Sequence, residues 1–350
     1  MIGIVFWSAV GVIAYVYAGY PLLVVGLAAL RRGRRHRTGG PLPTVTLVVA
    51  AYNEQDVIGR KVAEALALDY PPELLDIIVA ADGSDDATAH IARSFTDPRV
   101  TVLHHPERRG KMAALERAAE VATGEILAFS DANNRYTADA VQHLVAPFAD
   151  VEVGMVTGRK TVETDDGLGY SEGLYWRYEG IIRRAETRLG ICVAWNGEIL
   201  ALRRDLFAPA PRGVVNDDAW LALAVLTEGR RIVYEPDAVS IEPVSATAVE
   251  ERERRTRMFA GIWQLYGPRL AVRLPWRRPA TLWALVSHKL LRPVVALAFV
   301  AAGAATLAGL VATPAGGGIG SFAPPWPGIA AAAQVAGYGL ALVGPRVGGP

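Results

Sequence analysis

The N-terminal region constrains this chain most, because it holds a long run without a single charged residue. The run extends from Ile2 to Leu30 and exceeds the ~20 residues that a helix needs to cross a bilayer. Arginines follow it at once, whereas a cleaved signal peptide carries its positive charges before the apolar run. We therefore predict an uncleaved membrane anchor over 1–30 and a basic linker over 31–43, with everything after Arg31 in the cytosol.

Two further apolar runs lie near the other end of the sequence. Val294–Thr313 contains no charge, and a shorter run over Trp326–Val343 precedes Arg346. Basic residues before the first run and after the second give orientations that agree with a cytosolic middle region. The sequence thus predicts a C-terminal transmembrane hairpin over 293–350 and a multi-pass protein of the plasma membrane. The basic linker is expected to contact membrane lipid.

The composition agrees with a soluble domain between a few spans. Hydrophobic residues make up 51% of the chain and charged residues 20%, which is too apolar for an average soluble domain and too charged for a bundle of spans alone. The net charge is +1, so no overall positive field attracts nucleic acid, and we expect no nucleic-acid partner. Cys192 is the only cysteine, which excludes a disulfide within the chain and a Cys/His metal cluster.

Between Pro43 and Ser245, short β-branched runs alternate with amphipathic helical patterns. The runs are Val45–Val49, Ile77–Val79, Val100–Leu103 and Ile126–Phe129. This alternation is typical of βαβ units, so we predict an α/β domain with a mostly parallel sheet over 44–248. The helical region that follows, over 249–292, is expected to lie at the membrane interface.

A polar cluster follows each of these runs. The clusters are Ala50–Glu54, Ala81–Asp86, Arg108–Lys111 and Ser130–Asn134. Each one alone is compatible with a helix cap or a turn, where Asp, Ser, Asn and Gly are common. Ligands of parallel sheets bind beyond the carboxyl ends of the strands, which share one edge. The four clusters together therefore predict a site for a phosphorylated ligand and a divalent cation.

Taken in order, these clusters resemble the motifs of the processive-type inverting glycosyltransferases of family 2, which include cellulose, hyaluronan and poly-N-acetylglucosamine synthases. The resemblance extends from about Val45 to Trp263. It implies a GT-A fold with a Rossmann-like sheet, a nucleotide-sugar donor with uridine as its base, and Mg²⁺ or Mn²⁺ as cofactor. It also implies a glycan or lipid-linked acceptor, and it allows for accessory subunits that export a product.

The resemblance assigns residues to the donor. Those implied to bind it are Ala51, Tyr52, Asn53, Glu54, Asp82, Lys111, Arg254 and Arg257. Lys111 and Arg257 suit the phosphates, because their positive charges form charge-assisted hydrogen bonds with phosphate oxygens. The sequence departs from the family at Ala81, where the family has a first Asp. It departs again at Arg254 and Met258, where the family has Gln and Trp.

Two pairs of residues match the family's metal and base motifs. Asp131 and Asn133 stand where the family has Asp-x-Asp, so they are the implied ligands of the cation. Asp217 and Asp218 match its Glu-Asp pair, which makes Asp218 the implied general base and Asp217 its neighbour. Inverting transfer needs a group that takes the proton of the attacking hydroxyl, and a second carboxylate nearby raises the pKa of that group. An alternative stays open, in which both aspartates cap a helix over 219–226.

The acceptor side of the site is expected to contain aromatic residues. The residues assigned to it are Trp176, Trp195 and Gly197. The surrounding segment, 174–184, is aromatic and basic, and it either lines an acceptor groove, lies at the membrane surface or packs against the spans.

These observations predict a membrane-bound inverting glycosyltransferase that modifies a polysaccharide or glycan at the cytosolic membrane face. A second interpretation keeps the enzyme but gives it a polyprenyl-phosphate or glycolipid acceptor, which Met258 and the small number of spans favour. A third is an inactive membrane scaffold with a nucleotide-binding-like domain, which the departures at Ala81 and Asn133 favour.

Overall fold

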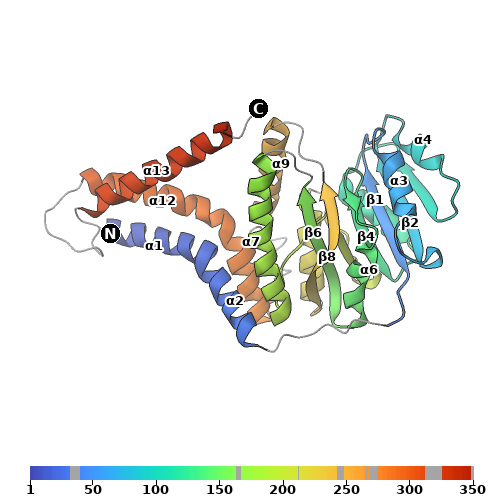
Figure 1. Cartoon of the computed structure of the whole chain (residues 1–350), viewed down its shortest axis with the longest axis horizontal. Coiled ribbons are helices and arrows are strands. Elements are labelled where there is room, and N and C mark those ends of the chain that lie inside the picture. The colour runs from blue at the N-terminus through green and yellow to red at the C-terminus, as the bar shows by residue number, and fades with distance from the viewer. Residues whose placement is uncertain are drawn as a thin grey trace.

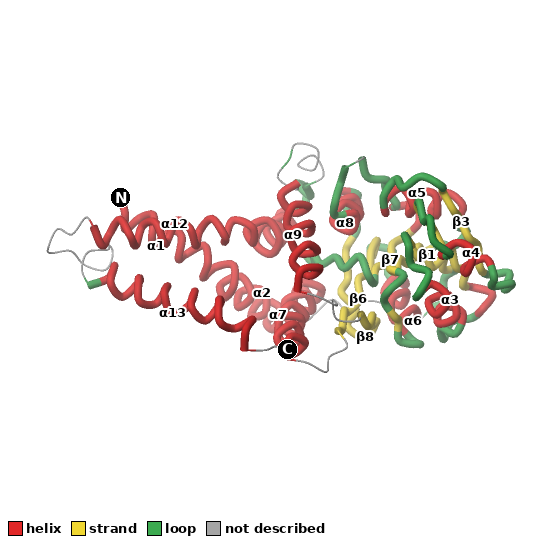
Figure 2. Tube along the Cα trace, turned by 90° about the horizontal axis from the view of Figure 1, so that it is seen from above, coloured by secondary structure: helices red, strands yellow, loops and turns green. Residues whose placement is uncertain are grey.

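The molecule has two parts, an α/β domain and a bundle of long apolar helices (Figure 1). The computed structural model describes residues 1–31, 40–162, 167–211, 213–242, 248–264, 267, 274–311 and 325–347. Helix α7 (Gly167–Leu189) stands between the sheet and the apolar helices in Figure 1. Seen from above, α9 (Ala248–Gln264) also lies at this junction (Figure 2).

The first apolar segment is helical from Ile2 to Leu30, as predicted. It consists of α1 (Ile2–Ala14), the π turn η1 (Tyr15–Gly19) and α2 (Tyr20–Leu30). The second segment begins at Pro279, before the predicted Val294. It consists of α11 (Pro279–Leu285), the π turn η5 (Val286–Leu290) and α12 (Leu291–Val311).

Both segments are long and apolar enough to cross a membrane, and only 22% and 28% of the residues in their most apolar windows are buried. The third predicted span is also helical, as α13 (Trp326–Val347). Among the described residues, however, only the other two segments are both long and apolar enough to cross a membrane. Most of the loop predicted before it, including 314–324, lies outside the described residues.

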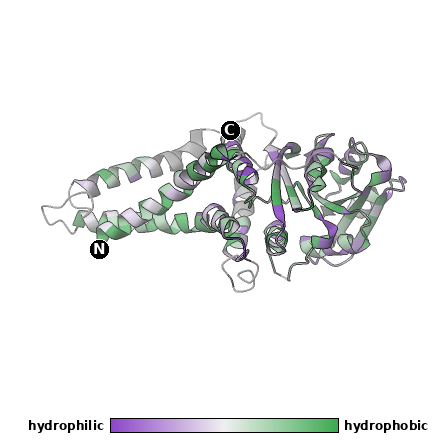
Figure 3. Cartoon of the chain, turned by 90° about the horizontal axis from the view of Figure 1, so that it is seen from below, coloured by the Kyte–Doolittle hydropathy of each residue, from purple (hydrophilic) through white to green (hydrophobic). Residues whose placement is uncertain are grey.

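The described residues of these helices are mostly hydrophobic, as the green colour of their ribbons shows (Figure 3). Leu22, Val300 and Leu307 are each about two-thirds exposed or more. On the inner side, α1 packs against α12 through Phe6 and the small residues Ala9, Ala298, Ala302 and Ala305. Small residues let helices approach closely in lipid, where the hydrophobic effect does not drive them together. An exposed apolar surface of this extent fits contact with a bilayer.

The sheet of the α/β domain has the strand order β3-β2-β1-β4-β7-β6-β8-β5 in the described part of the chain. The strands are β1 (Val45–Ala51), β2 (Leu75–Asp82), β3 (Val100–His105), β4 (Ile126–Asp131), β5 (Arg135–Tyr136), β6 (Val153–Val162), β7 (Leu200–Arg203) and β8 (Arg231–Glu242). Strands β3, β2, β1 and β4 are parallel, β7 runs antiparallel between β4 and β6, and β6 and β8 are parallel. The predicted α/β class with a mostly parallel sheet is confirmed.

Helices cover both faces of the sheet, because the strands are apolar on both sides. The remaining helices are α3 (Ile58–Leu66), η2 (Pro72–Leu74), α4 (Thr88–Arg93), α5 (Lys111–Val121), α6 (Ala140–Val145), η3 (Ala146–Ala149), η4 (Arg204–Leu206) and α8 (Asp217–Thr227). On one face the core contains Val62 of α3 and Leu144 of α6. On the other it contains Leu115 of α5 and Leu223 of α8, and it continues to Tyr20 in the N-terminal segment. The apolar helices therefore share a core with the domain.

Candidate active site

The carboxyl ends of parallel strands bring the predicted donor residues to one edge of the sheet. Ala51 ends β1 and pairs with Ala81, while Ala50 pairs with Asp131 at the end of β4. Asp82 ends β2. Because β1 lies between β2 and β4, the loop that follows Ala51 leaves the sheet between Asp82 and Asp131.

Hydrogen bonds fix the loop after β1 in an unusual backbone conformation. Asn53 has φ of +53°, a left-handed conformation that Asn tolerates better than most residues. Its side-chain amide donates to Asp85 at 2.7 Å, and its own Oδ1 accepts from the Asp85 amide at 3.1 Å. The Asn53 amide donates to Ser84 Oγ at 3.2 Å. Next to it, the Arg108 guanidinium lies 3.8 Å from the centre of the Tyr52 ring. A left-handed backbone at a residue other than glycine, as at Asn53, is strained, and such residues are often found in functional loops.

The carboxylate of Asp82 holds the start of helix α5. It is buried, and one oxygen accepts from the backbone amides of Arg109 and Gly110, at 2.8 and 2.6 Å. The other oxygen accepts from Arg117 Nη2 at 2.8 Å. Both oxygens thus serve the loop that leads into α5. The contact with uridine assigned to Asp82 stays a prediction.

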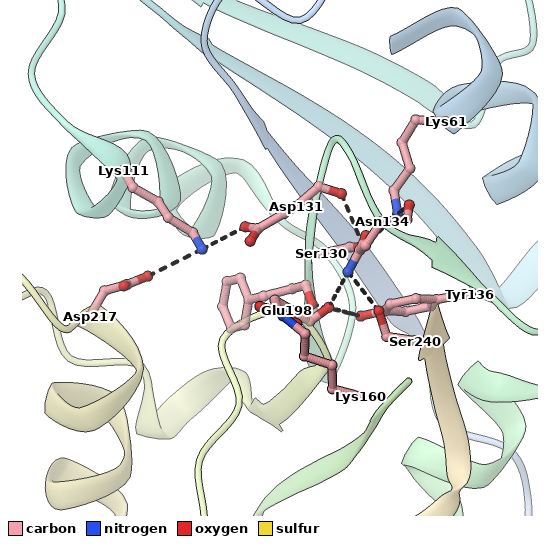
Figure 4. A network of polar contacts seen from close by, with 11 residues as sticks. Lys61, Lys111, Ser130, Asp131, Asn134, Tyr136, Lys160, Glu198, Asp217 and Ser240 are labelled. Carbon is pink, nitrogen blue, oxygen red and sulfur yellow. Dashed lines mark hydrogen bonds and ion pairs between the residues drawn. The ribbon is translucent and has the colours of Figure 1, made fainter. Parts of the chain in front are cut away.

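Lys111, the first residue of α5, reaches between two carboxylates (Figure 4). Its ammonium lies 2.6 Å from Asp131 Oδ1 and 3.8 Å from Asp217 Oδ2. Burial alone would lower the pKa of Lys111, but the charges of Asp131 and Asp217 outweigh it and raise the pKa. Lys111 is therefore a permanent cation that links the β4 end to the start of α8.

Asp218 has the properties expected of a general base near neutral pH. Burial and the neighbouring charge of Asp217 raise its pKa to about 6, against the opposing effects of the Ala219 amide and of Lys111 and Lys289. Its Oδ1 accepts from the Ala219 amide at 2.7 Å. The predicted start of the helix was two residues late, since α8 already begins at Asp217. The base and cap roles are thus compatible, because Asp218 lies in the first helical turn.

Helix α9 is attached to the loop in front of α8. Gln264 accepts from the Val215 amide at 3.0 Å, and the Asn216 side chain donates to the Met258 carbonyl at 3.3 Å. A Cβ at Gly261 would lie 2.2 Å from Asn216 Oδ1, so the two elements approach very closely. Arg257 is exposed on α9, as the predicted role at the donor phosphates requires. The side chain of Arg254 lies outside the described residues.

Of the predicted acceptor residues, Gly197 lies next to Asp218, the predicted base, and Trp195 precedes Gly197 by two residues. A Cβ at Gly197 would stand 3.5 Å from Asp218 Oδ2, so this glycine leaves room next to the carboxylate. Trp195 is buried, and the ammonium of Lys289 in η5 lies 4.4 Å from its ring centre. The sequence did not point to Lys289 as a site residue, because nothing local distinguishes it from other basic residues near the span.

Trp176 lies on α7, where the Arg183 guanidinium is 5.3 Å from its ring centre. The same helix packs against the N-terminal segment, since the Tyr178 hydroxyl donates to the Tyr17 carbonyl at 2.8 Å. Of the interpretations left open for 174–184, packing against the spans is therefore observed for this face of α7. The acceptor role of Trp176 stays a prediction.

A buried polar network beneath Asp131 was not predicted (Figure 4). Lys61 Nζ donates to Ser130 Oγ at 2.6 Å and to two oxygens of Asn134 at 2.7 and 2.8 Å. Asn134 in turn donates to the Glu198 carbonyl at 2.7 Å. The network thus joins the loop of the predicted metal ligands to the segment that contains Gly197.

A sequence signal for Lys61 existed. It lies at i+3 from Ile58 and i−4 from Ala65, so it falls on the apolar face of α3. A lysine on such a face is almost never fully buried unless it is paired. Burial lowers its pKa to about 7, although the charge of Asp131 acts in the opposite direction.

Asp131 and Asn133 fit the predicted cation by their chemistry. Carboxylate and amide oxygens are ligands that Mg²⁺ and Mn²⁺ prefer, and such ions usually keep water and phosphate oxygens as further ligands. The nearby Glu54 has a raised pKa, caused by burial and by the charges of Asp131 and Asp86, so negative charge is concentrated here. The described residues hold no cluster of three or more His, Cys, Asp or Glu side chains that could bind a metal ion.

Comparisons with known proteins agree with this geometry. The profile of Glycosyl transferase family 2 matches residues 46–207. A solved structure, the mannosyltransferase PcManGT from Pyrobaculum calidifontis in complex with GDP-Man and Mn²⁺, superposes with a TM-score of 0.74. It is 25% identical, and the match covers 98% of this chain and 92% of that one. The agreement includes the apolar helices, because it extends over nearly the whole chain.

Curated relatives are similar over part of their length. An N-acetylglucosaminyltransferase of Rhizobium meliloti (strain 1021) is 29% identical over 217 residues, which are 57% of this chain and 51% of the relative. A poly-β-1,6-N-acetyl-D-glucosamine synthase of Staphylococcus aureus (strain MSSA476) is 27% identical, over 63% of this chain and 55% of the relative. A β-monoglucosyldiacylglycerol synthase of Trichormus variabilis is 32% identical, over 35% and 27%. The chain thus spans about half the length, or less, of these relatives.

Proposed function

We propose that the chain transfers a hexose from a nucleotide sugar, with inversion, at the cytosolic face of the plasma membrane, because the profile of Glycosyl transferase family 2 matches its residues 46–207. One observation carries this proposal. Asp218, with a pKa of about 6, lies near the Lys111 ammonium, which is held between Asp131 and Asp217. The site thereby offers a base for one substrate and a cation for the phosphates of the other.

The reaction is a single in-line displacement. The acceptor hydroxyl oxygen bonds to the anomeric carbon, the bond from that carbon to the diphosphate breaks, and Asp218 takes the hydroxyl proton. A base with a pKa of about 6 is mostly ionised at neutral pH and still accepts a proton efficiently. We assign to Lys111 and Arg257 the role of stabilising the charge that develops on the departing diphosphate.

A divalent cation held by Asp131 and Asn133 would neutralise part of that same charge when it is bound. Lys111 already contacts one oxygen of Asp131, so a bound ion would have to share this carboxylate with the lysine. The Mn²⁺ in the complex of the Pyrobaculum mannosyltransferase supports the assignment.

The first candidate for the acceptor is a glycan, which the similarity to the poly-N-acetylglucosamine synthase supports. A lipid-linked acceptor is the second candidate. It is favoured by Lys289, which comes from an apolar segment and still contacts Trp195, two residues before Gly197. The β-monoglucosyldiacylglycerol synthase among the relatives is also consistent with a lipid acceptor.

Transfer of labelled sugar into native membranes tests the proposal. A panel of UDP- and GDP-sugars is supplied with Mg²⁺ or Mn²⁺ and then with EDTA, and organic extraction separates lipid products from polymer. We expect label from one donor, lost with EDTA. An inactive scaffold predicts neither transfer nor donor binding, and that result would overturn the proposal.

A further inference from the structure

Six charged side chains meet between α7 and the second apolar segment. They are Glu179, Arg183, Glu186, His288, Lys289 and Arg292. His288 Nδ1 lies 2.6 Å from Glu186 Oε1, and its Nε2 lies 3.2 Å from Glu179 Oε2. Both ring nitrogens of His288 therefore lie within hydrogen-bonding distance of a carboxylate oxygen. Two arginines, one lysine and one histidine therefore meet two carboxylates.

The two carboxylates are fully engaged by groups other than Lys289. Glu179 accepts from Arg292 and lies 3.7 Å from Arg183 Nη2. Glu186 accepts from the Tyr20 hydroxyl at 2.5 Å and, besides His288, from the backbone at Val193. Among the described residues Lys289 has no carboxylate within 4.0 Å, and its ammonium rests on the Trp195 ring. Lys289 thus carries a positive charge that the protein leaves unmatched.

Buried donors around this lysine also lack partners. Asn196 Nδ2 and the Nε atoms of Arg183 and Arg292 form no hydrogen bond within the part of the chain that the structure describes. Asn196 is 8% exposed and Arg183 is 4% exposed, so solvent does not satisfy them fully. Nearly all buried polar groups in native proteins have a partner, which is a protein group, an ordered water or an ion. All three unsatisfied atoms are donors, so the missing partner is an acceptor.

This cluster is connected to the base by a short stretch of chain. Trp195 contacts Lys289, and two residues later a Cβ at Gly197 would lie 3.5 Å from Asp218 Oδ2. The positive charge of Lys289 acts on the Asp218 carboxyl, as that of Lys111 does. Lys111, however, already has two carboxylate partners, at 2.6 and 3.8 Å. The unmatched cation is therefore the one from the apolar segment, on the side of the predicted acceptor residues.

We propose that Lys289, with Asn196 and Arg183, binds the phosphate diester of an anionic membrane lipid whose head-group hydroxyl is the acceptor. This inference rests on the proposed function and specifies its substrate class. Lys289 and Arg292 directly precede an uncharged run, and basic residues at the end of such a run bind lipid head groups. An ionised phosphate diester has no proton for a base to remove, whereas a hydroxyl does. We therefore assign the phosphate to recognition by Lys289 and the hydroxyl to attack on the sugar.

The first experiment identifies the product. The full chain in native membranes receives the labelled donor that supports transfer, and the labelled lipid is applied to an anion-exchange column. Hydrogen fluoride then cleaves phosphate diesters. We expect the labelled lipid to bind the column, and the label to leave the lipid after cleavage. Label in a neutral lipid, a water-soluble glycan or an insoluble polymer would overturn the inference.

The second experiment tests Lys289 itself. In Lys289→Gln we expect transfer to the lipid at subsaturating acceptor to fall about tenfold to a hundredfold, which is the usual effect of losing a hydrogen bond to a charged group. Lys289→Arg keeps the charge and should restore most of the transfer. Arg277→Gln is the matched control, because it removes one positive charge from an exposed position just before the same segment.

Donor affinity separates this inference from the proposed function. Lys289→Gln should bind the donor as the unmodified chain does, which also shows that it is folded. Unchanged lipid transfer in Lys289→Gln, or an equal loss in Arg277→Gln, would refute the role of Lys289. If the unmodified chain binds and transfers no nucleotide sugar, the proposed function itself fails.

Discussion

Replacing Asp218 by asparagine tests the general base directly. Asparagine has nearly the same size, and its Oδ1 can still accept from the Ala219 amide as Asp218 does at 2.7 Å, so α8 should start as before. The amide cannot take a proton. General base catalysis contributes about 100-fold to 10 000-fold, so we expect kcat to fall by a factor in that range. Donor affinity should stay nearly unchanged, because the base acts on the acceptor.

The dependence of kcat on pH is a second quantitative test of Asp218 as the general base. With a pKa of about 6, Asp218 is about one-tenth ionised at pH 5 and about nine-tenths ionised at pH 7, and kcat should follow these fractions. Asp217→Asn removes the second largest cause of the raised pKa. The acid limb should then move to lower pH, but stay above about 4, the usual pKa of aspartate, because burial remains.

The assay follows transfer of labelled sugar at saturating donor from about pH 4.5 to 8, with donor binding measured separately on the same preparation. An Asp218→Asn variant that keeps more than about a tenth of kcat would show that another group takes the proton. Loss of donor binding together with transfer would instead indicate a structural role. An acid limb that does not move in Asp217→Asn would refute the coupling of the two carboxylates.

Three further predictions concern the surroundings of the base. Gly197→Ala places a methyl group 3.5 Å from Asp218 Oδ2, so we expect a raised KM for the acceptor and an unchanged KM for the donor; equal effects on both would refute the position of the acceptor. Asp131→Ala should weaken donor binding at least about tenfold and remove its response to Mn²⁺ in a titration, whereas unchanged sensitivity to chelator would exclude Asp131 as a ligand. Lys61 has a pKa of about 7 when folded and about 10.4 when unfolded, so the unfolded chain binds more protons between these values and stability rises with pH there. Over two pH units this amounts to roughly 2–3 kcal/mol. Thermal unfolding at pH 7 and 9 should show that rise in the native chain and a smaller one in Lys61→Met.

The junction between the domain and the apolar helices gives the site its setting. The N-terminal segment contributes Tyr20 to the core, and its hydroxyl reaches Glu186 on α7. The two π turns also meet, since Tyr15 and Ser287 form a hydrogen bond of 2.8 Å. Turns of this kind are often found at functional sites, because they redirect side chains out of the regular helix pattern. Lys289 lies in the second of them.

Much of the fold could be predicted because its signals are local. The composition of an uncharged run such as 2–30 is enough to predict an apolar environment, and β-branched runs that alternate with amphipathic helices predict a parallel sheet. The position of the predicted donor residues at one edge of the sheet could be predicted from the sheet alone, since parallel strands end on the same side. For the same reason Asp82 and Asp131 were expected near each other, and the strand pairing of β1 with both their strands brings them there.

What the sequence by itself determined was therefore the class of fold, the apolar segments and the edge of the sheet where the chemistry lies. Only the tertiary structure decided which charges meet there. Lys61 and Asn134 are far apart in the chain, as are Lys289 and Trp195, and no local pattern links them. The structure also gave Asp82 a buried role that its motif did not reveal. Side-chain partners depend on how whole elements pack, and packing is a property of the complete chain rather than of any segment.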